Sequence, residues 1–218
     1  MARTFDRRVV PDFALDLVRA CQSLIPCHLG GGAALAGVYL GHRKTGDLDV
    51  FVHDREDMRA LAAQLPEVAA QTHVGLALLR DAGHLVRARL EASDGRSLEL
   101  DLVYEPVADV EAPPPPIEGI VVESLAELRA AKLTCILSRS EPRDLVDLYF
   151  LDQAGFPPLH DLEIAQRKDA GIDPGVLAWL VAQFPTQPLP TMLKPLTADQ
   201  LKSFRDLLAE ALRRIAVG

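Results

Sequence analysis

The chain has 218 residues, of which 49% are hydrophobic and 25% charged, a composition typical of a globular protein large enough to bury a core. Its net charge of −8, from 31 acidic and 23 basic residues, argues against a broad basic surface for long nucleic acids but not against a local basic groove. The three cysteines include no CxxC pair and the six histidines show no HxxxH or HExxH spacing, which argues against a disulfide framework and a zinc ribbon. Because no apolar run reaches membrane length either, we expect a cytoplasmic protein that does not enter a membrane.

The first half of the chain mixes helical and strand-like patterns. Apolar residues recur at helical spacing near the N-terminus, and later segments alternate apolar and polar residues around the turn signal Ser93-Asp94-Gly95. In chain order we expect a helix over 12–24, a short helix over 33–40, a strand over 48–53, a helix from 55 to about 65 capped by Asp54, a strand over 72–79, and a hairpin of strands 84–92 and 97–104.

Four consecutive prolines, Pro113–Pro116, interrupt this pattern and predict an extended, stiff connector. We therefore expect a core domain over 1–112, the connector over 113–116 and a helical domain over 117–218. Helical spacing beyond the prolines predicts helices over 124–137, 143–153, 173–184 and 197–215. The expected fold is α/β (α+β), with a mixed sheet and flanking helices followed by a helical C-terminal domain.

Two acidic residues interrupt an otherwise apolar strand. Asp47 and Asp49 point to one face because side chains alternate along a strand, whereas Leu48 and Val50 point to the other. Carboxylates about 7 Å apart along a strand can share a pair of hard cations. Two Mg²⁺ ions held in this way can clamp both oxygens of a phosphoryl displacement.

A glycine run precedes this strand. Gly30, Gly31 and Gly32 lead into the short helix, and unobstructed backbone N–H groups at a helix start bind anions. Phosphates held there, with metal at Asp47 and Asp49, would form a pocket for a nucleoside triphosphate. Taken alone, such a turn is more often structural.

A later strand repeats the acidic alternation. Glu99 and Asp101 share one face, and Asp101 could complete a three-carboxylate cluster if its strand lies beside Asp47 and Asp49. The alternative is a cross-strand ion pair, because Arg87 and Arg89 alternate on the preceding strand of the hairpin. The sequence leaves open whether Glu99 or Asp101 is the third carboxylate.

Two blocks of sequence resemble a known family. The first runs from Gly31-Gly32 through His42-Arg43-Lys44-Thr45 to Asp47-Leu48-Asp49-Val50-Phe51. The second joins Lys132 in one helix to Arg143-Asp144-Leu145-Val146-Asp147-Leu148 in the next. Together, over about 30–151, they resemble the nucleotidyltransferase superfamily with the DNA polymerase β-like fold, and within it the AbiEii toxins of type IV toxin–antitoxin systems. Residues 155–218 are similar only in being helical.

The resemblance implies site residues. Asp47 and Asp49 would be catalytic metal ligands, with Asp101 as the third carboxylate. The nucleotide-binding residues would be Gly31, Gly32, Arg43, Thr45, Lys132, Asp144 and Asp147, of which Lys132 would reach the triphosphate. The superfamily often has serine where this chain has Gly32, and the fourteen residues between Gly32 and Asp47 are more than many relatives have. Judged without the resemblance, Lys132 is an ordinary solvated lysine, Arg143 and Asp147 are a surface ion pair, and His42 is either a structural cap or a substrate contact.

The resemblance also implies an activity. The expected enzyme uses Mg²⁺ or Mn²⁺ to move a nucleoside monophosphate from an NTP to an acceptor hydroxyl, with RNA or the 3′ end of tRNA as the acceptor and an antitoxin protein as a partner. Basic groups available for RNA are Arg43, Lys44, Arg87, Arg89, Arg139 and Arg143. The alternatives are nucleotide transfer to a small molecule and a catalytically weak binding or regulatory module of the same fold.

Overall fold

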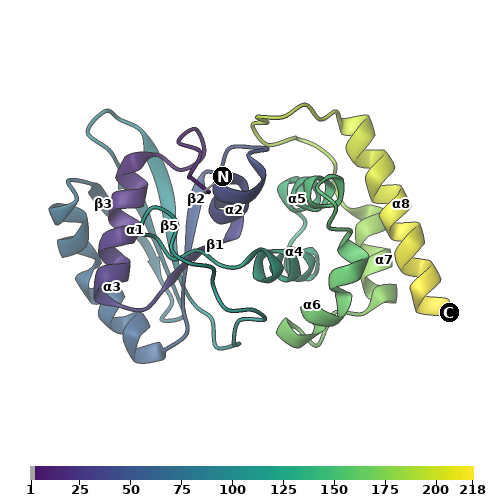
Figure 1. The fold of residues 1–218 in the computed structure, drawn as a ribbon, viewed down its shortest axis with the longest axis horizontal. Coiled ribbons are helices and arrows are strands. Elements are labelled where there is room, and N and C mark those ends of the chain that lie inside the picture. Colours follow the sequence, from purple (N-terminus) through teal and green to yellow (C-terminus); the bar gives the residue numbers. More distant parts are fainter. Residues whose placement is uncertain (1–2) are drawn as a thin grey trace. The chain divides into compact units, whose positions relative to one another are not determined.

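The structure, a computed structural model, describes residues 3–218 as two compact units (Figure 1). The first unit comprises residues 3–41 and 45–124, and the second comprises 42–44 and 125–218. The predicted division had assigned 117–124 to the helical domain. These residues instead join the first unit, because Leu29 N donates to Val121 O and Glu123 N donates to Leu29 O, both at 3.0 Å.

The first unit is built on a five-stranded mixed sheet. Its strands run in the order β1-β2-β5-β4-β3, with β2 and β5 parallel and the other pairs antiparallel. The predicted strand and hairpin are confirmed, whereas β1 was not predicted. The strands are β1 (His28–Gly30), β2 (Asp47–Val52), β3 (Gly75–Asp81), β4 (Leu85–Glu91) and β5 (Ser97–Tyr104).

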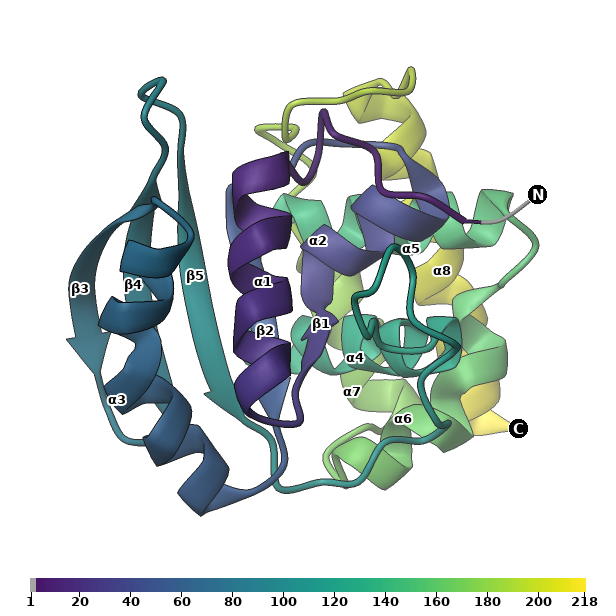
Figure 2. The ribbon, with the colours of Figure 1, turned by 60° about the vertical axis from the view of Figure 1, so that its left-hand side comes forward.

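Two amphipathic helices, α1 (Asp12–Leu24) and α3 (Arg55–Gln71), lie side by side on one face of the sheet (Figure 2). Helix α1 has the predicted bounds, and Asp54 caps α3 by accepting from Glu56 N and Asp57 N. The predicted end of α3 near residue 65 was wrong. The helix continues through Pro66 because Val68 and Ala69 extend its buried stripe, and β3 consequently starts later than predicted.

The glycine run opens a short helical segment made of α2 (Gly31–Ala34) and the π-helical η1 (Leu35–Leu40). It covers the predicted helix and begins two residues earlier. The segment ends at Gly41, whose N–H donates to Ala36 O at 2.9 Å and whose φ of 58° lies in the left-handed region.

The second unit is helical, and α7 packs against α8 within it (Figure 1). The four predicted helices are present, and the short elements between the second and third of them were not predicted. None of the helices in residues 3–218 combines the length and apolarity needed to cross a bilayer. The elements are α4 (Leu125–Ser138), α5 (Pro142–Gln153), the 3₁₀ helix η2 (Pro158–Asp161), α6 (Leu162–Lys168), α7 (Pro174–Gln183) and α8 (Ala198–Val217).

Candidate active site

The predicted carboxylates meet on two neighbouring parallel strands of the first unit. Asp47 and Asp49 are half-buried on β2, while Leu48 and Val50 between and beside them are fully buried. The register places Asp101 of β5 opposite Asp49, and Glu99 opposite Asp47. Residues paired across neighbouring strands point to the same face, so all four carboxylates share one face of the sheet.

Arg87 of β4 binds the third predicted carboxylate. Its Nε and second terminal nitrogen donate to the two oxygens of Asp101 at 2.7 and 2.6 Å, and its Nε lies 3.8 Å from Glu99 Oε2. The sequence posed two alternatives for Asp101, and both occur. Its strand lies beside that of Asp47 and Asp49, and its side chain pairs across the hairpin with Arg87. Asp101 is buried by this pairing, whereas the Glu99 side chain is 41% exposed.

The glycine turn touches the carboxylates directly. Gly30 pairs with Asp49 in the β1–β2 register, and Gly31 has a φ of 57°. A Cβ at Gly31 would lie 1.8 Å from Asp49 Oδ2, so only glycine fits there. Gly32 is buried in the first turn, whose N–H groups lack partners within the helix. The turn thus brings backbone amides and a carboxylate side by side, as a metal-bound phosphate requires.

Thr45 lies against the metal-ligand candidates. Its Oγ1 donates a 2.8 Å hydrogen bond to Asp47 Oδ1, which orients this carboxylate. The donor set fits a hard divalent cation, because Mg²⁺ is usually bound by one or two carboxylates together with substrate phosphates. Among residues 3–218, Asp47, Asp49 and Asp101 do not form a group whose ligand atoms all lie within 4.8 Å of one another. Both oxygens of Asp101 are bound by Arg87, which makes Asp101 the weaker candidate ligand.

The steric fit at Gly31 gives a first testable prediction. Gly31→Ala should lower nucleotide transfer by about 10²-fold or more, because its methyl group displaces the Asp49 carboxylate and a 1 Å misplacement can have that effect. The measurement is the initial transfer rate at saturating NTP. Gly95→Ala is the matched control, since Gly95 also has positive φ, 83°, with no atom within 4 Å of an added Cβ. Equal losses in both variants would contradict the proposed contact.

The second block of predicted residues forms a buried ion network within the second unit. Asp147 of α5 is fully buried and accepts from Arg43 Nε and the Arg43 terminal nitrogen at 2.7 and 2.8 Å. Lys132 Nζ lies 2.7 Å from Asp147 Oδ2, and His42 Nε2 lies 2.7 Å from Asp147 Oδ1. One carboxylate therefore joins two helices to the segment 42–44.

Asp144 extends the network by one turn of α5. It is fully buried, accepts from Arg139 Nε at 2.8 Å and lies 3.1 Å from Lys132 Nζ. Lys132 is thus a buried counter-ion of two aspartates rather than a solvated lysine. Asp147 does not serve as a surface partner for Arg143, whose Nε instead lies 2.5 Å from Glu141 Oε2.

Opposing effects set the protonation states of the network. Burial tends to raise the pKa of Asp147, but the charges of Arg43 and Lys132 outweigh it and hold that pKa well below its usual value. Burial also tends to raise the pKa of Asp144, but Lys132 and Arg139 outweigh this effect, so that the pKa of Asp144 is lowered. For His42 burial prevails: it lowers the pKa despite the hydrogen bond to Asp147, so the imidazole is neutral in the fold.

The lowered pKa of His42 predicts how stability depends on pH. The contribution of neutral His42 to the free energy of unfolding is complete above the unfolded-state pKa of about 6.5. It is lost as the pH falls below that value, because the unfolded chain then binds a proton that burial disfavours in the fold. His42→Gln should therefore flatten the decline of unfolding free energy below pH 6.5 by up to about 1.4 kcal/mol per pH unit. Urea unfolding from pH 7.5 to 5 measures this slope. His160→Gln, an exposed histidine, should leave it unchanged.

The chain is similar to one protein family and to several solved structures. The profile of the family described as "Nucleotidyl transferase AbiEii toxin, Type IV TA system" matches residues 17–216. No curated protein matches the sequence. JHP933 from Helicobacter pylori is a solved structure with 19% identity and a TM-score of 0.58, covering 93% of this chain and 90% of that one.

Two further solved structures share the fold. A putative nucleotidyltransferase from H. pylori is 18% identical with a TM-score of 0.59 and 93% coverage of both chains. MenT4, a nucleotidyltransferase toxin from Mycobacterium tuberculosis, is 17% identical with a TM-score of 0.56, covering 94% of this chain and 86% of that one. With the family match spanning most of the chain, the resemblance drawn from the sequence is confirmed: this protein belongs to the AbiEii toxin family of type IV toxin–antitoxin systems and is a nucleotidyltransferase.

Proposed function

We propose that the protein transfers a nucleoside monophosphate from an NTP to an acceptor hydroxyl in a reaction that depends on Mg²⁺ or Mn²⁺. The observation that carries the proposal is the contact between the Gly31 backbone and the Asp49 carboxylate, on the face shared with Asp47. When bound, the divalent metal supplies positive charge that offsets the charge of the phosphates. Asp47 and Asp49 are the ligands, with Asp101 as the third carboxylate once a nucleotide competes for Arg87.

The chain's own groups act by positioning. Backbone N–H groups of Gly31 and Gly32 bind the triphosphate, and Thr45 fixes the rotamer of Asp47. The acceptor oxygen forms a bond to the α-phosphorus while the bond to the β-phosphate oxygen breaks, pyrophosphate leaves and the hydroxyl proton passes to solvent. Most of the rate enhancement then comes from orientation and charge complementarity.

The residues of the buried ion network have an indirect role in this proposal. They are Arg43, Lys132, Asp144 and Asp147. Because they bind one another in a buried network, we assign them to positioning rather than to direct contact with the nucleotide. Their network fixes the segment 42–44, which leads along the chain directly to Thr45 and Asp47. The predicted contact between Lys132 and the triphosphate is replaced by this indirect role.

For the acceptor we propose the 3′ end of an RNA, with tRNA as the first candidate, and for the regulator a cognate antitoxin protein. Arg89 supports an RNA acceptor, since it lies opposite Glu99 on β5 and therefore shares the face of the carboxylates. Arg87 lies on the same face, but Asp101 engages its guanidinium, which makes it a weaker candidate. Arg139 and Arg143 are engaged by Asp144 and Glu141 and are weaker candidates. NTPs and Mg²⁺ are plentiful in the cytoplasm, which we propose as the place of action.

The test is label transfer. The protein is incubated with Mg²⁺, each α-labelled NTP in turn, and separated RNA, protein and small-molecule fractions of a cell lysate. We expect label in RNA from one NTP, lost in the double variant Asp47→Asn/Asp49→Asn. Label in the small-molecule fraction would replace the RNA acceptor by a small one. NTP binding without label in any fraction would identify a binding module and overturn the proposal.

A further inference from the structure

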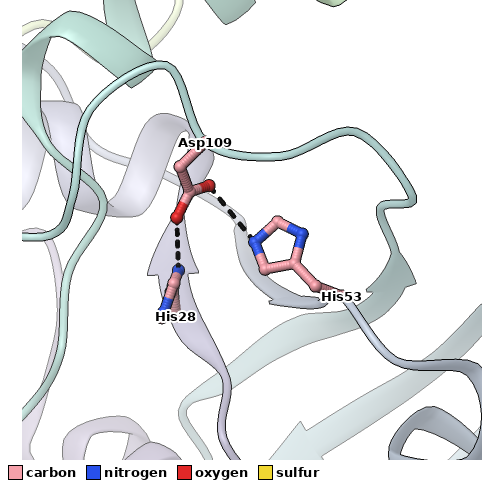
Figure 3. A group of neighbouring side chains, drawn as sticks. All are labelled: His28, His53 and Asp109. Carbon is pink, nitrogen blue, oxygen red and sulfur yellow. Dashed lines mark ion pairs between the residues drawn. The ribbon is translucent and has the colours of Figure 1, made fainter.

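Three potential metal ligands converge at one end of the sheet in the first unit. His28 is the first residue of β1, His53 directly follows β2, and Asp109 lies in the segment after β5 (Figure 3). They meet because β1 runs antiparallel to β2, with His28 paired to Phe51, and β2 runs parallel to β5. The topology therefore brings residues 25 and 56 positions apart in sequence to the same edge.

The distances suit a transition-metal site. Asp109 Oδ2 lies 3.4 Å from His28 Nδ1, and Asp109 Oδ1 lies 3.2 Å from His53 Nε2. One ligand atom from each residue can be chosen so that all three lie within 4.8 Å of one another. Tetrahedral zinc with bonds of about 2.0–2.1 Å separates its ligand atoms by about 3.3 Å. The side chains are 18%, 34% and 15% exposed in the order His28, His53 and Asp109, so the site is sheltered but reachable by an ion.

The hydrogen bonding of His53 presents its other nitrogen for coordination. The Nδ1 atom lies 2.8 Å from the backbone oxygen of Glu105, which can only accept, so Nδ1 carries the proton. A carbonyl partner of this kind is the usual outer contact of a metal-binding histidine. In the neutral ring Nε2 then directs a lone pair towards Asp109 Oδ1. Both atoms are buried, and neither has a hydrogen bond to any residue in 3–218.

Two acceptor atoms 3.2 Å apart require a cation between or beside them. A proton on His53 Nε2 would be enough to link His53 to Asp109, and such a link would need no second imidazole beside it. The presence of His28 Nδ1 at 3.4 Å from the same carboxylate favours a cation that takes three ligands. Imidazole nitrogens select zinc and its neighbours rather than Mg²⁺, which prefers oxygen.

We propose that His28, His53 and Asp109 form a binding site for Zn²⁺ or a similar divalent transition metal, separate from the proposed Mg²⁺ site. Asp49, the nearer of the two proposed Mg²⁺ ligands, lies four residues before His53, which corresponds to about 13 Å of strand. The ion fixes the segment between β5 and α4, which has no regular helix or strand of its own, to the sheet edge. Three protein ligands leave a fourth position for water or a further ligand.

Cobalt substitution tests the proposal. The full chain, stripped of metal with a chelator, is titrated with Co²⁺ in excess Mg²⁺, and visible absorption reports nitrogen-ligated Co²⁺ of low coordination number. We expect saturation at one equivalent per chain, loss of the band on adding Zn²⁺, and a rise in the thermal midpoint with Zn²⁺. His53→Gln and Asp109→Asn should weaken binding by more than the about 10- to 100-fold that an outer partner of a ligand contributes.

Two controls separate this site from the others. His160→Gln removes an exposed histidine, and Asp47→Asn/Asp49→Asn removes the carboxylates of the proposed Mg²⁺ site, and both should keep the cobalt band. Loss of the band in the double carboxylate variant with retention in His53→Gln would overturn the proposal. If His53→Gln does not fold, the wild-type titration still decides, because absence of a one-equivalent endpoint shows that His53 and Asp109 are an ion pair without metal.

Discussion

Asp49→Asn should reduce nucleotide transfer by about 10²- to 10³-fold or more, the scale expected when one group that stabilises transition-state charge is removed. The substitution keeps the size of the side chain and removes the negative charge that a divalent cation requires. It also leaves the Gly31 turn intact, since the amide occupies the same space beside the glycine backbone. The measurement is the single-turnover rate with the labelled NTP and acceptor identified by label transfer, at several Mg²⁺ concentrations.

The control for charge alone is Asp16→Asn, which changes the net charge equally at an exposed position on α1. It should transfer nucleotide at the wild-type rate. High Mg²⁺ should restore part of the Asp49→Asn activity if the loss is one of metal affinity. A variant within threefold of the wild type at every Mg²⁺ concentration would rule out Asp49 as a metal ligand.

Asp147→Ala should destabilise the protein by about 3–5 kcal/mol, the range measured when one partner of a buried ion pair is removed. The variant leaves Arg43 and Lys132 buried without this counter-charge, and His42 without its hydrogen-bond acceptor. The free energy of unfolding is measured by urea denaturation followed by circular dichroism. Activity should fall together with stability, because segment 42–44 loses its anchor.

Glu141→Gln supplies the comparison for an exposed pair. Its partner is Arg143, its side chain is 46% exposed, and surface pairs contribute about 0–1 kcal/mol. A loss below 1 kcal/mol in Asp147→Ala as well would mean that water reaches the network and screens it. Asp147→Asn should fall between the two variants, since the amide retains an acceptor for His42.

Sequence periodicity identified most of the elements because their apolar faces are long enough to show a period. Helix α1 and the β4–β5 hairpin have the predicted positions for this reason. Strand β1 has only three residues, too few for alternation to appear, and it is fixed by pairing with β2 and Val122. Pro66 was a misleading signal, because the stripe of α3 continues beyond it.

For the candidate site, the sequence indicates which side chains share a face but not which residues they contact. The shared face of Asp47 and Asp49 follows from strand alternation, but the placement of Asp101 depends on the β2–β5 register. The Asp147 network joins residues 104 positions apart, which no local pattern reveals. A usable signal was present: Asp144 and Asp147 lie three residues apart among apolar side chains of α5, where unpaired charge would be costly.

The small segment 42–44 has a consequence for protein chimeras. The chain passes between the compact units after residues 41, 44 and 124, so the sheet unit and the helical unit alternate along the sequence rather than following one another. A hybrid that exchanges the first 124 residues with a relative also exchanges the guanidinium that neutralises Asp147. A compatible hybrid must therefore keep an arginine at position 43, or replace Arg43 and Asp147 together. Recombination at the proline run alone preserves neither unit, because the unit boundaries lie at residues 41, 44 and 124.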